Sequence, residues 1–225
     1  MRSGGWEAAY HYEAPSLVGG DYCDLLSLEE NLYFVVGDVT GKGVSAAMLM
    51  AHLNAMFRAL VPLGLTLERV MEQASRMFCE STLPTHFATL ACGKASSSGE
   101  VELSIAGHHP VLLIHDSQVT RVEATGLPLG MFCDEHFTTN KTRCEPGDSI
   151  FLYTDGLIEA VDSSGKEYGI DRLAELLRAH SSLTADELIS SCLSDLMSFR
   201  SGTPIADDLT MMAIRRKKPG SDAKE

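Results

Sequence analysis

Three short acidic motifs constrain this chain most, because each places a carboxylate where an apolar, strand-like run ends or begins. The motifs are VVGDVTG at residues 35–41, IFLYTDG at 150–156 and DDLTMM at 207–212. Strands of this kind stack side by side in a core, so their ends converge on one rim. Carboxylates gathered on a rim repel one another unless a cation lies between them, and hard oxygen ligands favour Mg²⁺ or Mn²⁺. The motifs therefore predict a metal-dependent hydrolase.

Each of these acids has an ordinary explanation when it is taken alone. Asp38, Asp155 and Asp207 are all compatible with simple turns, and for a single motif the turn is the better explanation. The metal hypothesis depends on their recurrence and on the lack of a basic neighbour in sequence beside Asp155 or Asp207. Asp21, which follows two glycines, would be a fourth member. Unpaired buried carboxylates are costly, whereas bound divalent ions would stabilise them.

Charge, cysteine use and hydropathy exclude several other classes. The chain has 225 residues and a net charge of −13, which fits one domain and argues against a broad nucleic-acid surface. No run of 18 apolar residues predicts a membrane span, and no C-x-x-C pair supports a zinc or redox site. We therefore expect a cytoplasmic protein, in which Cys79, Cys92 and Cys192 are small core residues.

The pattern of turns and apolar runs predicts two groups of antiparallel strands with helices outside them. Residues 6–216 form the expected domain, the polar residues 217–225 a disordered tail, and residues 1–5 resemble the cut end of a linker from a longer, sensor-linked protein. Expected strands cover 6–15, 31–38, 86–94, 100–105, 110–115, 118–122, 149–154 and 209–215. Expected helices cover 45–60, 66–81 (with Thr66 as N-cap), 170–179 and 185–199, the last opened by a capping box of Thr184 and Glu187.

Two glycine-rich and apolar features at residues 37–60 have competing interpretations. The strand–turn–helix there superficially matches a phosphate-binding loop, but Gly37 and Gly41 enclose three residues where that loop requires four, so we reject it.

The helix 45–60 is rich in Ala, Met and Leu on nearly every face. Either both faces are buried within the domain, which we favour, or one face contacts a partner. Polar substitutions at Met50 and Phe57 would decide between them.

Five motifs in order resemble one family. They are GGDYCD at 19–24, GDVTGKG at 37–43, AGHHP at 106–110, YTDGLIEA at 153–160 and DDLT at 207–210. Together they closely resemble the bacterial SpoIIE-like (RsbU-like) branch of the PPM-type metal-dependent serine/threonine protein phosphatases, from about residue 8 to 215. The resemblance implies an α+β fold, a four-layer α/β/β/α sandwich with two mainly antiparallel central sheets, and metals in a cleft at one edge.

The resemblance also implies roles for particular residues. Two Mn²⁺ or Mg²⁺ ions would be bridged by Asp38, with the Val39 carbonyl on one of them. Asp155 and Asp207 would complete one metal shell, and Asp21 would face the other ion directly or through water. Asp208 would act behind the ligands or help to hold a further ion. A metal-bound hydroxide would then attack the phosphoserine or phosphothreonine phosphorus, so the catalytic carboxylates are Asp38, Asp155 and Asp207.

The chain departs from eukaryotic members of the family at two points, and from the family's usual pattern at a third. Thr40 replaces a histidine two residues after the bridging acid, and the N-terminal arginine that binds phosphate is missing. His109 stands where the family usually has asparagine. We interpret His108 and His109 as structural residues of a turn before Pro110, and Lys42 as a solvated turn residue.

The expected substrate is a phosphorylated regulatory protein, a STAS-type anti-sigma-factor antagonist. A pseudophosphatase that only binds, and a phosphohydrolase for small molecules, remain the alternatives. The family also implies an N-terminal sensor domain and a homodimer contact through the helix 45–60.

Overall fold

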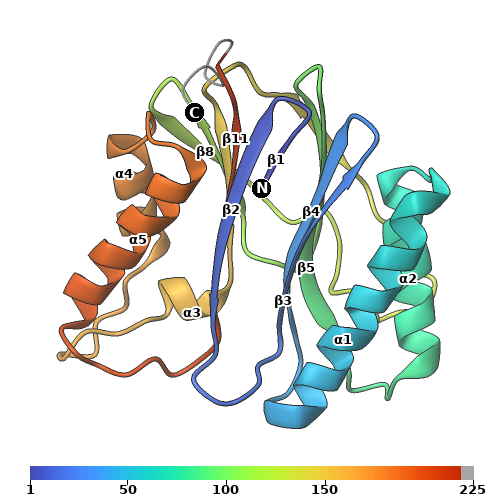
Figure 1. Cartoon of the computed structure of the whole chain (residues 1–225). Coiled ribbons are helices and arrows are strands. Elements are labelled where there is room, and N and C mark those ends of the chain that lie inside the picture. Colours follow the sequence, from blue (N-terminus) through green and yellow to red (C-terminus); the bar gives the residue numbers. More distant parts are fainter. Residues whose placement is uncertain (219–225) are drawn as a thin grey trace.

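The computed structural model describes residues 1–218 and consists of two sheets between two pairs of helices (Figure 1). The first sheet has the strand order β1 (Arg2–Ser3), β2 (Trp6–Glu13), β11 (Leu209–Arg216), β10 (Ser149–Tyr153), β7 (Val111–His115) and β8 (Gln118–Val122). The second has the order β3 (Asp21–Leu28), β4 (Asn31–Val39), β5 (Ala88–Ser96), β6 (Glu100–Ala106) and β9 (Asn140–Arg143).

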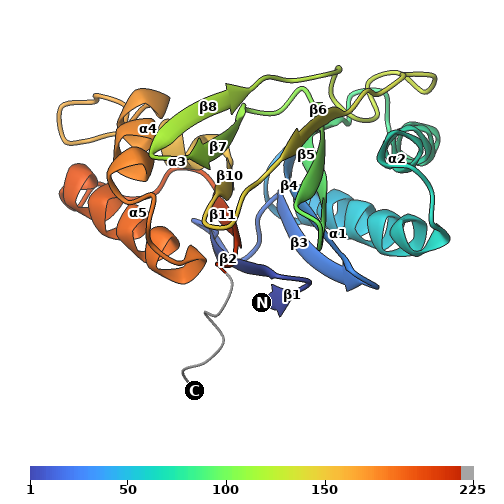
Figure 2. The same ribbon diagram turned by 90° about the horizontal axis from the view of Figure 1, so that it is seen from above.

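The helices lie outside the two sheets. They are α1 (Gly43–Leu60), α2 (Leu67–Ser81), the short α3 (Asp155–Ile158), α4 (Ile170–Ala179) and α5 (Ala185–Arg200), and a 3₁₀ turn, Val61–Leu63, follows α1. Figure 2 shows α1 and α2 beside the second sheet, and α4 and α5 beside the first. Every strand pair is antiparallel. The predicted four-layer α/β/β/α sandwich is confirmed.

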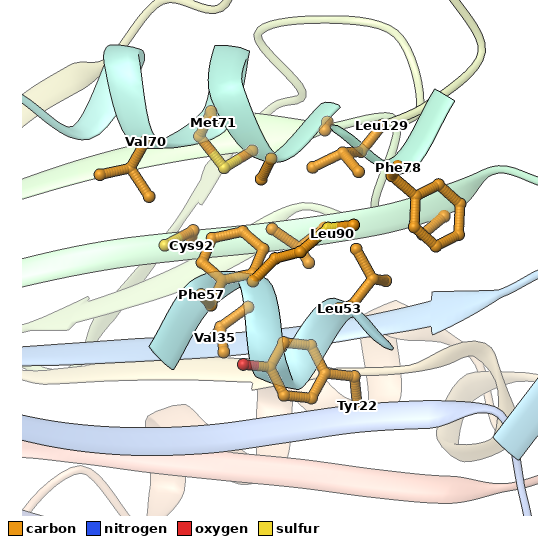
Figure 3. Close-up of a cluster of buried hydrophobic side chains, with 14 of the residues drawn as sticks. Tyr22, Val35, Leu53, Phe57, Val70, Met71, Phe78, Leu90, Cys92 and Leu129 are labelled. Carbon is orange, nitrogen blue, oxygen red and sulfur yellow. The ribbon is translucent and has the colours of Figure 1, made fainter. Parts of the chain in front are cut away.

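The layered packing explains why the central strands are apolar at nearly every position. A strand in the middle layers has one face against the other sheet and one against helices, so β10 is buried at all five residues. One core cluster lies between the sheets and includes Trp6, Phe34 and Ile150. A second lies under α4 and α5, and a third joins the second sheet to α1 and α2 (Figure 3).

Both predicted helix starts are confirmed. The Thr66 side chain accepts a hydrogen bond from the Arg69 backbone N–H. Thr184 and Glu187 form the predicted capping box, in which each side chain accepts from the other residue's backbone N–H. The tail prediction falls mainly on residues 219–225, which lie outside the described residues.

Several predictions about local structure were wrong. Strand β3, which Asp21 opens, was not predicted. Strand β9 and helix α3 were also missed, since they are only four residues long. Cys79 is disulfide-bonded to Cys133 and is not a plain core residue. The two cysteines are 54 positions apart in sequence, and nothing in the sequence predicted this pairing, because Cys133 lies in a loop without strand or helix periodicity.

Helix α1 also differs from the prediction that both its faces are buried. Leu53 and Phe57 pack in the core, but Val44 and Met48 are each 70 % exposed. Phe57 therefore could not have distinguished a partner surface from the core. By length and composition alone the segment Gly43–Leu63 would suffice to cross a membrane, with a mean hydropathy of 1.4. Polar residues interrupt its apolar run, and in the fold its buried side chains pack on the second sheet.

Candidate active site

The three acidic motifs and Asp21 meet at one rim of the sandwich, as the sequence predicted. Strand β4 carries Asp38 at its end, directly opposite Asp21 at the start of β3. In the other sheet, β10 ends beside the start of β11, with Tyr153 opposite Met211. Asp155 follows the first of these strands and Asp207 precedes the second. The two sheets therefore bring carboxylates from both halves of the chain together.

Asp38 lies at the centre of this carboxylate cluster. Its half-buried side chain has its pKa raised to about 7, first by burial and then by the negative charges of Asp155, Asp207 and Asp208. Like charges this close oppose ionisation. The negative charges of these carboxylates are therefore not fully compensated by neighbouring protein groups, and such a site favours binding of a cation.

Asp21 is a buried carboxylate that ties the two sheets together. Its Oδ2 accepts hydrogen bonds from the hydroxyls of Thr154 at 2.7 Å and Thr210 at 2.5 Å, both from the opposite sheet. Burial raises its pKa to about 8, while the two hydroxyls lower it and Asp38 and Asp208 raise it further. Sequence reasoning missed both threonines as site residues, although each stands within a quoted motif beside a predicted ligand.

Asp208 holds the glycine turn that precedes Asp21. Its Oδ2 accepts the backbone N–H of Gly20 at 2.5 Å and that of Asp21 at 3.2 Å. The close packing around Asp208 requires glycine at two positions. A side chain at Gly19 would overlap the Asp208 carboxylate, and one at Gly156 would overlap the Asp208 backbone carbonyl. Asp208 therefore fixes its neighbours' positions by hydrogen bonds.

Lys42 is more than a solvated turn residue. Its Nζ lies 2.9 Å from Asp207 Oδ2, although its side chain is 76 % exposed. The prediction that no basic residue neutralises Asp207 was therefore wrong. Lys42 contacts Asp207 in the fold although the two residues are 165 positions apart in sequence. The glycine-rich turn after Asp38 carries the lysine back across the rim, a path that sequence spacing did not reveal.

A cleft of about 240 Å³ opens beside the cluster. Asp38, Asp207 and Asp208 line it together with Val39 and the glycine turns, and Lys42 is the one cationic side chain among its described lining residues. Asp21 and Asp155 are not among these lining residues. The cleft gives a phosphate-sized group access to the carboxylates.

The donor set suits a hard divalent cation, but its members are engaged elsewhere in this structure. Within residues 1–218, no three His, Cys, Asp or Glu side chains are already grouped to hold a metal. Three of the five carboxylates have an internal partner in place of a shared ligand: Asp21 the two threonines, Asp207 the lysine and Asp208 the backbone.

His108 is structural, as the sequence analysis proposed. It is 6 % exposed, its Nε2 donates to the Tyr153 carbonyl at 3.0 Å, and its Nδ1 faces the Thr89 hydroxyl at 3.0 Å. This bond ties the second sheet to the end of β10, just before Asp155. His109 stacks on the Tyr153 ring with 5.9 Å between centroids.

We expect His108 to make the fold sensitive to acid. Burial lowers its pKa from 6.5 to about 3, so the imidazole is neutral in the fold, whereas the unfolded chain binds a proton below about pH 6.5. Its contribution to stability is complete above that pH and is lost as the pH falls toward 3, by roughly 2 kcal/mol between pH 6.5 and 5. Urea unfolding at pH 7 and pH 5 should show the stability gap between wild type and His108→Asn narrowing by that amount. An unchanged gap would refute a neutral buried His108.

Comparison with known proteins supports a phosphatase fold. The family model "Stage II sporulation protein E (SpoIIE)" matches residues 29–217. Protein IcfG of Synechocystis is 28% identical over 243 residues, covering 94% of this chain and 38% of that protein. Phosphoserine phosphatase RsbU of Bacillus subtilis is 26% identical over 203 residues, covering 89% of this chain and 60% of that protein. The chain thus spans 38% and 60% of these two relatives, less than two thirds of either.

Solved structures agree on the fold. The crystal structure of the RsbU and RsbW domains of Rv1364c from Mycobacterium tuberculosis matches with a TM-score of 0.84 and 32% identity, over 96% of this chain and 62% of that one. RsbX in complex with magnesium matches with a TM-score of 0.70 and 17% identity, over 93% and 94% of the two chains, and this likeness concerns the fold alone.

The sandwich has the fold of the PP2C phosphatase domain of SpoIIE from Bacillus subtilis, which matches with a TM-score of 0.83 and 18% identity. The chain belongs to the SpoIIE family, whose model covers it from β4 through β11. The resemblance seen in the five sequence motifs is confirmed.

Proposed function

We propose that this domain hydrolyses phosphoserine or phosphothreonine on a regulatory protein with the help of two Mn²⁺ or Mg²⁺ ions. The observation that carries the proposal is the crowding of Asp155, Asp207 and Asp208 around Asp38 at the mouth of a cleft. The relation to phosphoserine phosphatase RsbU, and the magnesium complex of RsbX, support the reaction and the kind of metal.

The ligand assignments follow from where each carboxylate lies. Asp38 is central and would contact both ions, with the Val39 carbonyl on one. Asp155 and Asp207 approach from the other sheet and would complete one shell, while Asp21 would serve the second ion directly or through water. Asp208, already bonded to two backbone N–H groups, would position Asp21 and not bind an ion itself.

Bound divalent ions supply two kinds of help, a lowered pKa for a water molecule and neutralisation of charge on the phosphoryl oxygens. The chain's own residues do the rest. The glycine turns let the backbone approach the phosphate closely, and Lys42 lies on the cleft wall where an anion would enter. Thr40 has no useful pKa for proton transfer, so solvent supplies the proton to the leaving serine.

The biological context is proposed from the family. A STAS-type phosphoprotein is the substrate, and a sensor domain in the longer protein controls turnover. The exposed Val44 and Met48 lie at the start of α1, just after Gly43, which lines the cleft, and would form a surface for that domain or for a second copy of the chain. A shift of α1 would move the Asp38 turn, which couples the contact to the rate.

The test is phosphate release by the purified chain from a phosphoserine peptide and from a phosphorylated STAS protein, each with Mn²⁺. We expect Mn²⁺-dependent release from both and a higher kcat/KM on the protein. Binding of the phosphoprotein without release would favour a pseudophosphatase. Release confined to small phosphate esters would favour a small-molecule phosphohydrolase.

We expect Lys42→Gln to change metal and phosphate binding in opposite directions. Loss of the ammonium frees Asp207, so Mn²⁺ should bind about threefold more tightly, as for a weak exposed ion pair. Inhibition by inorganic phosphate should weaken because a cation has left the cleft. Calorimetry with Mn²⁺ and inhibition kinetics measure the two effects, and Lys42→Arg, which keeps the charge, should show neither. Changes in the same direction would contradict this role.

A further inference from the structure

The disulfide between Cys79 and Cys133 joins the last turn of α2 to the long loop between β8 and β9. Cys133 is exposed and Cys79 is half-buried, so a reductant can reach this bond from solvent. The other four cysteines are free thiols, and three of them are buried. A change in redox conditions therefore acts on the disulfide before it acts on the buried thiols.

The two segments that carry these cysteines meet again at the start of β5. Ala88, the first residue of that strand, exchanges two backbone hydrogen bonds with Leu129, of 2.9 and 2.8 Å. Residues 79–88 and 129–133 therefore form a ring, which the disulfide closes at one end and this hydrogen-bonded pair closes at the other. Reduction of the disulfide opens the ring.

Packing does little to hold residues 81–87, the part of the ring that follows α2. None of these seven residues is buried. A hollow of about 590 Å³ lies between this segment and α1, with His52 on the helix side and His86 on the other. Segments with few buried contacts have low local stability. The disulfide therefore restrains a segment that packing leaves free to move.

This segment in turn holds the turn that follows Asp38. The Thr40 backbone N–H donates to the Phe87 carbonyl at 3.0 Å, and the Phe87 N–H donates to the Thr40 hydroxyl at 3.2 Å. The Thr40 N–H and the Val39 carbonyl belong to one planar peptide group, so the bond to Phe87 also fixes the direction of that carbonyl. Val39 lines the cleft, and its carbonyl is the backbone ligand of the proposed metal site.

We propose that the Cys79–Cys133 disulfide is a redox switch of metal binding at the active site. When the bond is oxidised, the closed ring holds residues 81–87 and, through Phe87, the peptide group that carries the Val39 carbonyl. When the bond is reduced, the segment moves and the carbonyl is no longer held in one direction. The effect on the rate rests on the proposed phosphatase function, whereas the loosening of the turn does not.

Helix α2 itself stays in place on reduction, so the change is local. Ser75 accepts the backbone N–H of Gly130 at 3.0 Å, one turn before Cys79. Glu72 lies 2.9 Å from the Nδ1 atom of His136, another residue of the same loop. These contacts keep the helix and the loop together, and only the chain beyond the helix is released.

The switch is set by thiol–disulfide exchange with a dithiol. One thiolate of the dithiol attacks the exposed Cys133 sulfur and expels the Cys79 thiolate, which takes up a proton. The second thiolate then attacks the reductant's own sulfur in the mixed disulfide and releases Cys133, which is also protonated. Two electrons and two protons thus pass to the protein, and the dithiol becomes a disulfide.

The test is amide hydrogen exchange of the full chain in chelator, with and without dithiothreitol, so that neither metal nor substrate is needed. Reduction should speed exchange at Thr40 and Phe87 about tenfold, within the usual range for coupled sites, while residues 150–152 in the first sheet keep their protection. After removal of the dithiol under argon, Mn²⁺ should bind the reduced chain about tenfold more weakly than the oxidised chain. Reoxidation should reverse both changes.

Two variants serve as controls. Cys79→Ser/Cys133→Ser should resemble the reduced wild type and should not respond to dithiothreitol. Cys192→Ala removes a free thiol under the helices of the other sheet, and it should respond to dithiothreitol as the wild type does.

Three outcomes would overturn the switch. Exchange at Thr40 and Phe87 that reduction leaves unchanged would show that the disulfide does not hold the turn. Faster exchange throughout the chain would show a cross-link that only stabilises the fold. A loosened turn with unchanged Mn²⁺ affinity would show no connection to the metal site. If the exchange and Mn²⁺ changes occur but neither redox state releases phosphate, the switch stands and the proposed phosphatase function fails.

Discussion

Asp38→Asn should lower the rate of phosphate release at least about a thousandfold, since the electrostatic stabilisation of a reacting phosphoryl group depends on ions held by this residue. The fold should persist and become more stable without metal. Burial and three neighbouring carboxylates raise the Asp38 pKa to about 7, so a neutral amide relieves repulsion at neutral pH. Thermal unfolding with chelator should therefore give a higher Tm for the variant than for the wild type.

A control variant and the Tm distinguish a specific loss of catalysis in Asp38→Asn from general damage to the protein. Asp134→Asn removes a carboxylate whose side chain is 89 % exposed in a loop, and it should keep the wild-type rate and Tm. An Asp38→Asn protein that is folded and retains its rate would refute the role of Asp38. An inactive Asp38→Asn protein with a lowered Tm would show that the residue supports the fold and not the reaction.

Chelation should abolish turnover, and Mn²⁺ should restore it far better than Ca²⁺. The expected loss is again at least about a thousandfold, because the carboxylates alone only repel a phosphate. Ca²⁺ is larger and prefers more ligands than this rim offers, so it should bind without supporting the reaction geometry. The measurement is hydrolysis of an aryl phosphate after chelation and readdition of each ion. Full turnover in excess chelator would sink the metal mechanism.

The sequence predicted the layers of the fold because hydrophobic period and turn residues are local signals. The strands β4, β10 and β11 are buried at nearly every position because both their faces are covered, and their largely apolar runs indicate this directly. Strand β3 was missed because its residues are only partly buried at an edge of the sheet, and acidic residues and glycines mark its start as a turn.

The sequence correctly predicted that the site residues converge on one rim, but it did not predict which side chains contact them. Motif order placed Asp38, Asp155 and Asp207 on one rim, because strand ends in packed sheets share an edge. The contacts of Asp207 with Lys42, and of Asp21 with Thr154, join segments more than 100 residues apart. Such pairings depend on how the two sheets are stacked, and no local pattern encodes them. The disulfide was missed because Cys133 lies in a loop that has no periodic pattern to place it beside α2.

The most direct measurement is the number of Mn²⁺ ions bound by the purified chain, determined by electron paramagnetic resonance of free Mn²⁺ during titration. A site built around a carboxylate shared by both ions predicts two bound ions in the wild type. It also predicts that Asp38→Asn loses affinity for both together, whereas Asp134→Asn binds as the wild type does. Undiminished binding of two ions by Asp38→Asn, or no binding by the wild type, would contradict a two-metal site centred on Asp38.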